Sequence, residues 1–224
     1  MEAVASHCFE GQVWRVVFDE TPTEHAAQMI IVETRNKATK SVRWTAIDGV
    51  SGAVVWQRQA ADWWESLANC QRGLVVIKQF SDATQPAPRG TFMLNAADGT
   101  TSEAAQIPIA TTAAQHFFKF PAAYTAESTH FEEMARFVCD QTKNKPVETI
   151  EYAELNGHVV LTFYYRTDNE LNQAILVVDK NGKTVLSEPL ANNLVGLTPV
   201  SFLISDKNLY FVKNKSEFVV LGFN

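Results

Sequence analysis

The chain is dominated by short runs of β-branched, aromatic and aliphatic residues, and most of these runs end at a turn signal. Runs of this length and composition predict β-strands, and their close spacing predicts an all-β antiparallel protein. The strands are expected at Val13–Phe18, Met29–Thr34, Ser41–Ile47, Ala53–Gln57, Gly73–Phe80, Thr91–Asn95, His158–Tyr165, Ala174–Val178, Asn208–Val212 and Glu217–Phe223.

Between several of these runs stand Asp-Gly or Asn-Gly turns, at Asp48-Gly49, Asp98-Gly99 and Asp179-Lys180-Asn181-Gly182. Glycine and asparagine adopt the positive φ that a tight hairpin turn requires, and aspartate accepts hydrogen bonds from the backbone that follows it. We therefore interpret Asp48, Asp98 and Asp179 as turn formers.

The runs repeat. Units that share the order strand, strand, acidic or small residues, glycine and final strand begin near Met29, Gly73, Gly157 and Ser201, in steps of 44, 84 and 44 residues. A fixed period of this size is typical of a β-propeller, and the double step predicts one further unit in the middle of the chain.

The expected architecture is a single propeller domain over residues 1–224, with five blades at about 29–72, 73–116, 117–156, 157–200 and 201–224. The last blade lacks a strand, so the N-terminal strand at 12–18 is expected to complete it and close the ring. Rings of four or six blades, and a large β-sandwich or barrel, are the alternatives. Within the third blade, Phe131, Met134, Ala135 and Val138 have helical spacing and predict an inserted helix at Glu127–Cys139.

Two segments, AIDGVSGAVVW and VVDKNGKTVL, resemble the quinoprotein-type propeller repeat, in which an aliphatic strand precedes an Asp, a Gly turn and a Trp. The longer pattern VWRVVFDE, IVETRN, Trp63-Trp64, PAPRGTF and IEYAEL resembles an uncharacterised family of small propeller-like proteins from Bacteroidetes. The resemblance covers most of the chain and implies a WD40-like ring of unknown function. Only Trp56 matches the repeat's tryptophan well, so no quinone or other cofactor is expected.

Charge and targeting signals restrict the partners and the compartment. Nineteen Lys and Arg against 25 Asp and Glu give a net charge of -6, so the chain has no overall positive field that would attract nucleic acid. No apolar run reaches the roughly 20 residues of a membrane span, and Glu2 stands where a secretory signal carries a basic residue. We expect a soluble cytoplasmic protein, of bacterial origin by the resemblance above. Cys8, Cys70 and Cys139 have no ligand or disulfide spacing and are expected to be reduced and mostly buried.

Two local clusters are the candidate ligand-binding residues. Asp62, Trp63 and Trp64 place adjacent aromatic rings beside carboxylates, and one ring could stack against a sugar or a partner's side chain while the other packs inward. Glu33 and Arg35 stand two residues apart, hence on one face of a strand, where they could meet a ligand in an axial channel. Packing of both rings between blades, and a structural ion pair between Glu33 and Arg35, are the simpler alternatives.

The leading hypothesis is a non-catalytic binding or scaffold module for an unknown protein, small molecule or glycan. The alternative is a carbohydrate-binding or glycoside-hydrolysing protein, because glycoside hydrolysis needs two carboxylates across a sugar, and Glu33, Asp62 and Glu133 are candidates. The five histidines are scattered and no G-x-S-x-G, Walker or G-x-G-x-x-G motif occurs, so neither a metal site nor a catalytic nucleophile is expected.

Overall fold

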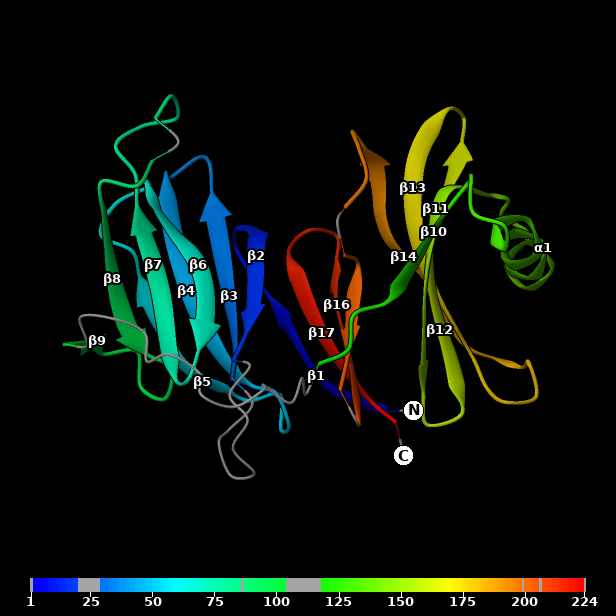
Figure 1. Cartoon of the computed structure of the whole chain (residues 1–224), viewed down its shortest axis with the longest axis horizontal. Coiled ribbons are helices and arrows are strands. Elements are labelled where there is room, and N and C mark those ends of the chain that lie inside the picture. Colours follow the sequence, from blue (N-terminus) through cyan, green and yellow to red (C-terminus); the bar gives the residue numbers. More distant parts are fainter. Residues whose placement is uncertain are drawn as a thin grey trace. The chain divides into compact units, whose positions relative to one another are not determined.

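The structure is a computed structural model of the chain, and it describes residues 2–19, 29–85, 87–103, 118–198, 200–205 and 207–223. The chain divides into two compact units (Figure 1). The N-terminal unit is Ala5–Phe117, and the C-terminal unit combines Phe118–Asn224 with Met1–Val4.

The N-terminal unit contains two antiparallel four-stranded sheets, and strands adjacent in sequence are adjacent in each sheet. One sheet is formed by β2 (Gln12–Phe18), β3 (Met29–Asn36), β4 (Ser41–Asp48) and β5 (Val54–Gln59). The other is formed by β6 (Glu65–Gln71), β7 (Leu74–Gln79), β8 (Gly90–Asn95) and β9 (Thr101–Ser102).

Apolar side chains from both sheets form the core of the N-terminal unit. They alternate along the strands, because successive strand residues point to opposite faces. The buried members are Met29, Ile31, Val42, Trp44 and Ala46 from the first sheet and Leu67, Cys70, Val75, Ile77, Leu94 and Ala96 from the second sheet and its β8–β9 turn. Trp56 of β5 lies against this core and its indole N–H donates to the carbonyl oxygen of Ala96 over 2.7 Å.

The C-terminal unit has a five-stranded sheet and a four-stranded sheet. The five-stranded sheet runs in order through β10 (Ala122–Thr125), β11 (Pro146–Leu155), β12 (His158–Thr167), β13 (Glu170–Val178) and β14 (Thr184–Leu194). The four-stranded sheet has the order β1 (Glu2–Cys8), β17 (Glu217–Gly222), β16 (Asn208–Lys213) and β15 (Phe202–Ile204).

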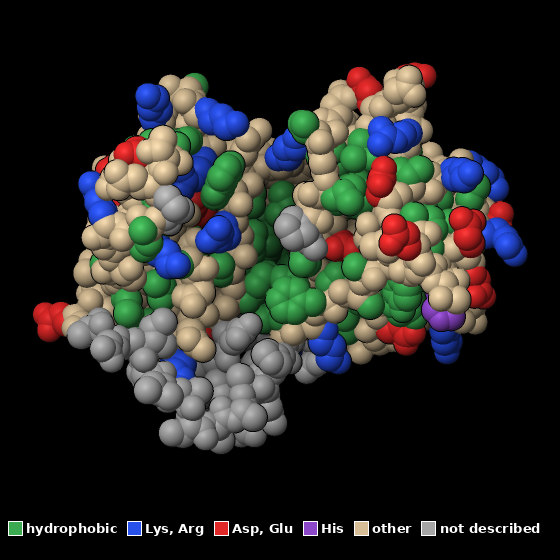
Figure 2. All heavy atoms as spheres, turned by 45° about the horizontal axis from the view of Figure 1, so that its top comes forward, with side chains coloured by type: hydrophobic (Ala, Val, Ile, Leu, Met, Phe, Trp, Pro, Cys, Tyr) green, Lys and Arg blue, Asp and Glu red, His purple; other side chains and the backbone are tan. Residues whose placement is uncertain are grey.

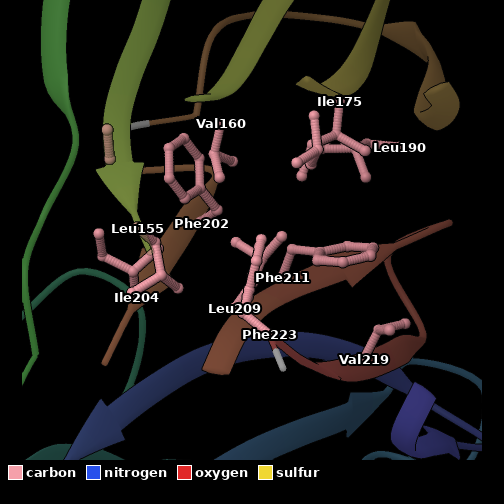
Figure 3. Close-up of a cluster of buried hydrophobic side chains, with 12 residues drawn as sticks. Leu155, Val160, Ile175, Leu190, Phe202, Ile204, Leu209, Phe211, Val219 and Phe223 are labelled. Atoms are coloured by element: carbon pink, nitrogen blue, oxygen red, sulfur yellow. The ribbon is translucent and has the colours of Figure 1, made fainter. Parts of the chain in front are cut away.

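The five-stranded sheet is buried on both faces, which explains why β12 and β13 are nearly continuous apolar runs. Val160, Ile175 and Val177 point to one face and pack with Phe202, Leu209, Phe211 and other side chains of the four-stranded sheet (Figure 3). Leu161, Phe163 and Leu176 point to the opposite face and pack against helix α1 (Phe131–Thr142) through Phe131, Ala135 and Val138.

The helix predicted at 127–139 is present as α1, slightly later in the sequence. Glu132 and Glu133 lie in its first turn, where acidic side chains interact favourably with the helix dipole. The helix ends at Lys143, which has a φ of 66° and whose N–H donates to the carbonyl oxygen of Cys139. This is the left-handed C-cap that commonly terminates helices.

The propeller prediction is wrong. The described residues form four separate antiparallel sheets of four or five strands, and none of the sheets is closed or curled. All ten strands predicted from apolar runs are present, with ends that differ by at most four residues. The error lies in how the strands were grouped into sheets and in strands that were not predicted, such as β1 and β6.

Two pairings and one unpredicted strand account for the wrong grouping. First, β2 pairs with β3 from Gln12↔Arg35 to Phe18↔Ile30, so residues 12–18 do not complete the C-terminal sheet, and β1 occupies that edge instead. Second, β11 pairs directly with β12, so the predicted blades 117–156 and 157–200 form one sheet. Third, β6 starts the second sheet at Glu65, and its polar sequence ESLANCQ carries little strand signal.

The three aspartates interpreted as turn formers do cap hairpin turns. Asp98 accepts hydrogen bonds from the backbone N–H and hydroxyl of Thr100, which hold the pKa of its carboxyl below the usual value. Asp179 accepts from the backbone N–H groups of Lys183 and Asn181, and its pKa is likewise lowered.

In the part of the chain described, no helix has the length and apolar character needed to cross a bilayer.

Candidate functional site

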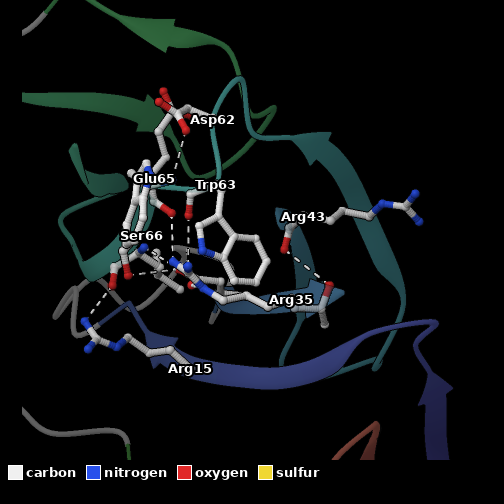
Figure 4. A network of polar contacts seen from close by, with 11 residues as sticks. Arg15, Arg35, Arg43, Asp62, Trp63, Glu65 and Ser66 are labelled. Atoms are coloured by element: carbon white, nitrogen blue, oxygen red, sulfur yellow. Dashed lines mark hydrogen bonds and ion pairs between the residues drawn. The ribbon is translucent and has the colours of Figure 1, made fainter. Parts of the chain in front are cut away.

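The predicted ligand-binding residues come together where β3 faces the start of β6. Glu33 and Arg35 project from β3 toward the second sheet, on the same face as the core residue Ile31. The segment Asp62–Glu65, which leads into β6, lies over them (Figure 4). The strand alternation that the sequence indicated for Glu33 and Arg35 therefore places both in contact with a second element 30 residues further along the chain.

Glu33 and Arg35 form a buried ion pair. Arg35 Nε lies 2.6 Å from Glu33 Oε1, and the two side chains are 9% and 0% exposed. The other guanidinium nitrogens donate to the carbonyl oxygens of Trp63 and Glu65, each over 2.9 Å. The second carboxylate oxygen of Glu33 accepts from the backbone N–H of Leu67 and, over 3.4 Å, from the hydroxyl of Ser66. The structural ion pair weighed as the simpler alternative is thus present, and its polar groups are committed to the protein.

Arg35 also lies close to two indole rings. Its guanidinium carbon lies 5.0 Å from the ring centroid of Trp63 and 5.3 Å from that of Trp14. A guanidinium within about 6 Å of an aromatic ring is attracted by the ring's electron-rich face. Trp63 is half-buried against the core, whereas Trp14 is 56% exposed. Trp14 is therefore the solvent-facing part of this cluster.

A β-bulge brings Trp14 over Arg35. In the pairing of β2 with β3, Val13 lies opposite Thr34 and Arg15 lies opposite Glu33, so Trp14 is the extra residue. Arg15 follows it and donates from its guanidinium to the carbonyl oxygen of Leu67 over 2.6 Å. Sequence reasoning missed Trp14, because regular alternation along 12–18 says nothing of a bulge.

Asp62 and Trp64 lie at the edge of the cluster. Asp62 Oδ2 forms an ion pair with Arg89 over 3.1 Å, and its Oδ1 accepts from the backbone N–H of Trp64 over 3.2 Å. Trp64 is half-buried. The structure therefore brings all five predicted residues into one region but gives Glu33 and Asp62 separate cationic partners.

Glu65 completes the buried layer. It is 4% exposed, and its carboxylate accepts from the backbone N–H of Ala61 over 3.0 Å and from the side-chain amide of Gln79 over 2.9 Å. Its backbone carbonyl accepts from Arg35. In the ranges that the structure describes, no group of three or more His, Cys, Asp or Glu side chains is arranged to hold a metal ion.

Comparison with known protein families gives a match that lies within the N-terminal unit. A family model described as a domain of unknown function, DUF4905, matches residues 23–103. The match includes β3 to β9 and therefore Glu33, Arg35 and the Asp62–Glu65 segment, but not Trp14. No curated protein matches the chain.

Proposed function

We propose that the chain is a non-catalytic binding module whose ligand, a saccharide, stacks on the exposed face of Trp14. The observation that carries the proposal is the arrangement of Trp14 over Arg35. An exposed indole is a common platform for the apolar face of a flat ring, and this one lies against a guanidinium that is itself hydrogen-bonded to the protein.

The rigidity of the platform comes from the buried layer beneath it. Each nitrogen group of Arg35 donates a hydrogen bond to the protein, and Trp63 packs on the guanidinium from another side. Trp14 therefore rests on a cation that cannot rotate away. A side chain ordered in the free protein loses less conformational entropy on binding, which supports a role in recognition.

The surroundings of Trp14 favour a saccharide over a large protein partner. Its neighbours Gln12 and Arg15 are polar and exposed. The other large, exposed apolar residues described in the N-terminal unit, Val50, Val54 and Val55, lie at the β4–β5 hairpin, on the opposite edge of the sheet from β2. A single ring with polar groups beside it matches a sugar, which has one apolar face and a rim of hydroxyls, whereas protein interfaces generally have contiguous apolar patches.

The same contacts argue against glycoside hydrolysis. A glycosidase needs one carboxyl group as acid and another as base or nucleophile, both reaching the scissile bond. Glu33 is fully buried and paired with Arg35, Asp62 is paired with Arg89, and Glu133 lies on α1 in the other unit. The Bacteroidetes origin suggested by the resemblance stays a prediction and contributes nothing to this proposal.

The proposal is tested by screening the full chain against a glycan array and then measuring affinity for the retained glycans by calorimetry. We expect Trp14→Ala to weaken binding by about five- to 150-fold, taking the roughly 1–3 kcal/mol of a nucleic-acid base stacked on one aromatic ring as the scale for a stacked sugar. Trp14→Phe should retain part of the affinity. Phe120→Ala, which removes a 59% exposed aromatic ring from the C-terminal unit, is the matched control and should bind as the wild type does. Retention of no glycan, or equal affinity of Trp14→Ala, would show the proposal to be wrong.

A further inference from the structure

We infer that the N-terminal unit has a second binding site, for a small zwitterion that carries both a carboxylate and an ammonium group. The site is a polar pocket of about 210 Å³. It is lined by the β1–β2 turn, by β3 and β4, and by Gln57 of β5; the lining residues are Cys8, Phe9, Glu10, Gly11, Thr34, Asn36, Ser41, Arg43 and Gln57.

The pocket is separate from the Trp14 platform. Thr34 and Asn36 alternate with Glu33 and Arg35 along β3, so the pocket lies on the opposite face of the sheet. Thr34 lies directly opposite Arg43 on β4, which places both side chains on that face. Binding in the pocket can therefore be measured independently of binding at Trp14.

The wall of the pocket depends on a glycine. A Cβ atom built on Gly11 would lie 2.7 Å from the carbonyl oxygen of Arg35 and 3.1 Å from the backbone nitrogen of Asn36. No residue with a side chain can approach the β3 backbone so closely without displacing it. Gly11 thus lets the β1–β2 turn, with Glu10, lie directly against the end of β3.

Most polar groups of the lining are already satisfied within the protein. Asn36 Oδ1 accepts from the backbone N–H groups of Ala38 and Thr39 over 3.0 and 3.3 Å. The Thr34 hydroxyl donates to the carbonyl oxygen of Arg43, and the Gln57 amide donates to the hydroxyl of Thr45, both over 3.4 Å. These bonds fix the shape of the pocket and leave few neutral groups for a ligand.

The two charged side chains of the lining, unlike the neutral polar ones named above, have no hydrogen-bond partner among the described residues. Neither Arg43 nor Glu10 forms an ion pair or a side-chain hydrogen bond with any residue in the described ranges. Figure 4 shows the Arg43 guanidinium extending away from the polar network around Arg35. One cation and one anion are therefore available at the same cavity, with no partner for either among the residues that the structure describes.

This pair of charges selects the ligand class. A guanidinium binds a carboxylate through two parallel hydrogen bonds, and a carboxylate accepts hydrogen bonds from an ammonium group. Because both residues are exposed, either contact alone is weak in water, and a ligand must satisfy both to gain useful affinity. A pocket of about 210 Å³ suits a ligand of the size of a free amino acid.

The test uses the full chain and measures binding of proteinogenic amino acids by calorimetry and by alkylation of Cys8. Cys8 is exposed and lines the pocket, so a bound ligand should slow its alkylation, while Cys139 in the C-terminal unit serves as the internal reference. We expect at least one amino acid to bind. Its N-acetyl and carboxamide derivatives should each bind about tenfold more weakly or worse, because each lacks one charge.

Arg43→Gln and Glu10→Gln should each reduce affinity for the amino acid to that of the corresponding blocked derivative. Lys78→Gln and Glu103→Gln, which change exposed charges outside the pocket, are the matched controls and should leave affinity unchanged. The inference is overturned if no amino acid binds or protects Cys8, or if the blocked derivatives bind the unmodified chain as tightly as the free amino acid. Because the blocked derivatives are tested on the unmodified chain, misfolding of a variant cannot mask the result.

Discussion

Glu33 and Glu151 occupy equivalent positions in the two units. Glu33 is on the second strand of its sheet and accepts the backbone N–H of Leu67, at the start of the next sheet. Glu151 is on the second strand of the five-stranded sheet and accepts a hydrogen bond from the backbone N–H of Ser201 over 3.0 Å. Ser201 immediately precedes β15 of the four-stranded sheet. In both units, one buried carboxylate joins two sheets that are consecutive in sequence.

The charge on these two carboxylates is compensated differently. Glu33 forms an ion pair with Arg35, two residues later in the strand. The residue two positions after Glu151 is Ala153, which carries no charge. Glu151 instead accepts a hydrogen bond from the Thr162 hydroxyl over 2.7 Å. Further polar groups lie nearby: the Tyr164 hydroxyl is 2.8 Å from the Thr198 hydroxyl. Figure 2 shows acidic and basic side chains interspersed on the visible surface, whereas Glu151 is only 4% exposed.

Removing the partner of Glu33 should be severely destabilising. Arg35→Met leaves a buried carboxylate without its cation, and breaking a buried ion pair in this way costs about 3–5 kcal/mol. The double variant Glu33→Gln/Arg35→Met should lose much less than the sum of the two single variants. Urea unfolding of the wild type, the two single variants and the double variant gives the coupling energy directly. Additive losses in the free energy of unfolding would contradict the ion pair between Glu33 and Arg35.

Glu151→Ala should also destabilise the protein, because it leaves the Ser201 N–H and the Thr162 hydroxyl without an acceptor. Each unsatisfied buried donor costs about 1–3 kcal/mol. Glu151→Gln keeps an acceptor oxygen and should cost less. The free energies of unfolding of the two variants, measured in urea, should therefore differ, and equal losses would mean that the carboxylate oxygens are not the groups that matter.

Gly99 tests the packing of Trp56. A Cβ atom on Gly99 would lie 2.7 Å from the Trp56 ring, and Gly99 has a φ of 72°. Gly182 has a similar φ of 76° but has no atom within 4 Å of the same position, so Gly182→Ala measures backbone strain alone. We expect Gly99→Ala to lose about 1–3 kcal/mol more than Gly182→Ala through overpacking. Thermal unfolding at matched concentration measures the difference, and equal losses would contradict the close approach.

Stability should fall at alkaline pH through Cys70. Burial, together with the negative charge of Asp19, raises the pKa of the Cys70 thiol well above its usual value. In the unfolded chain this thiol ionises near pH 8.5, so its contribution is complete below that pH and is lost as the pH rises above it. The free energy of unfolding should decrease by about 1.4 kcal/mol per pH unit between pH 9 and 10.

The comparison for this prediction is made in a Cys8→Ala/Cys139→Ala background, with and without Cys70→Ala. The window stops at pH 10 because burial and hydrogen bonding to Glu154 raise the pKa of Tyr152 to about 12, and this phenol contributes a further pH dependence above its usual value of 10. An unchanged slope after removal of Cys70 would assign the alkaline loss of stability to other groups.

The candidate site shows where sequence reasoning stops. The two-residue spacing of Glu33 and Arg35 on a predicted strand was enough to place them on one face and to suggest an ion pair, because strand alternation is a local property. The position of Asp62–Glu65 over them was not predictable, since it depends on how the second sheet packs on the first. Trp14 was missed for a related reason, because a bulge is defined by pairing with another strand.

The sequence by itself determined ten of the strands, the turn residues and helix α1, because alternation, β-propensity and turn chemistry act over a few neighbouring residues. Strands with a polar sequence, such as β6, were not predicted. The tertiary structure decided which strands share a sheet. A repeat near 44 residues is compatible with several groupings, and only the pairing of β2 with β3 and of β11 with β12 selects four separate sheets. Those pairings depend on burial of both faces of the strands by residues distant in sequence, which local patterns do not encode.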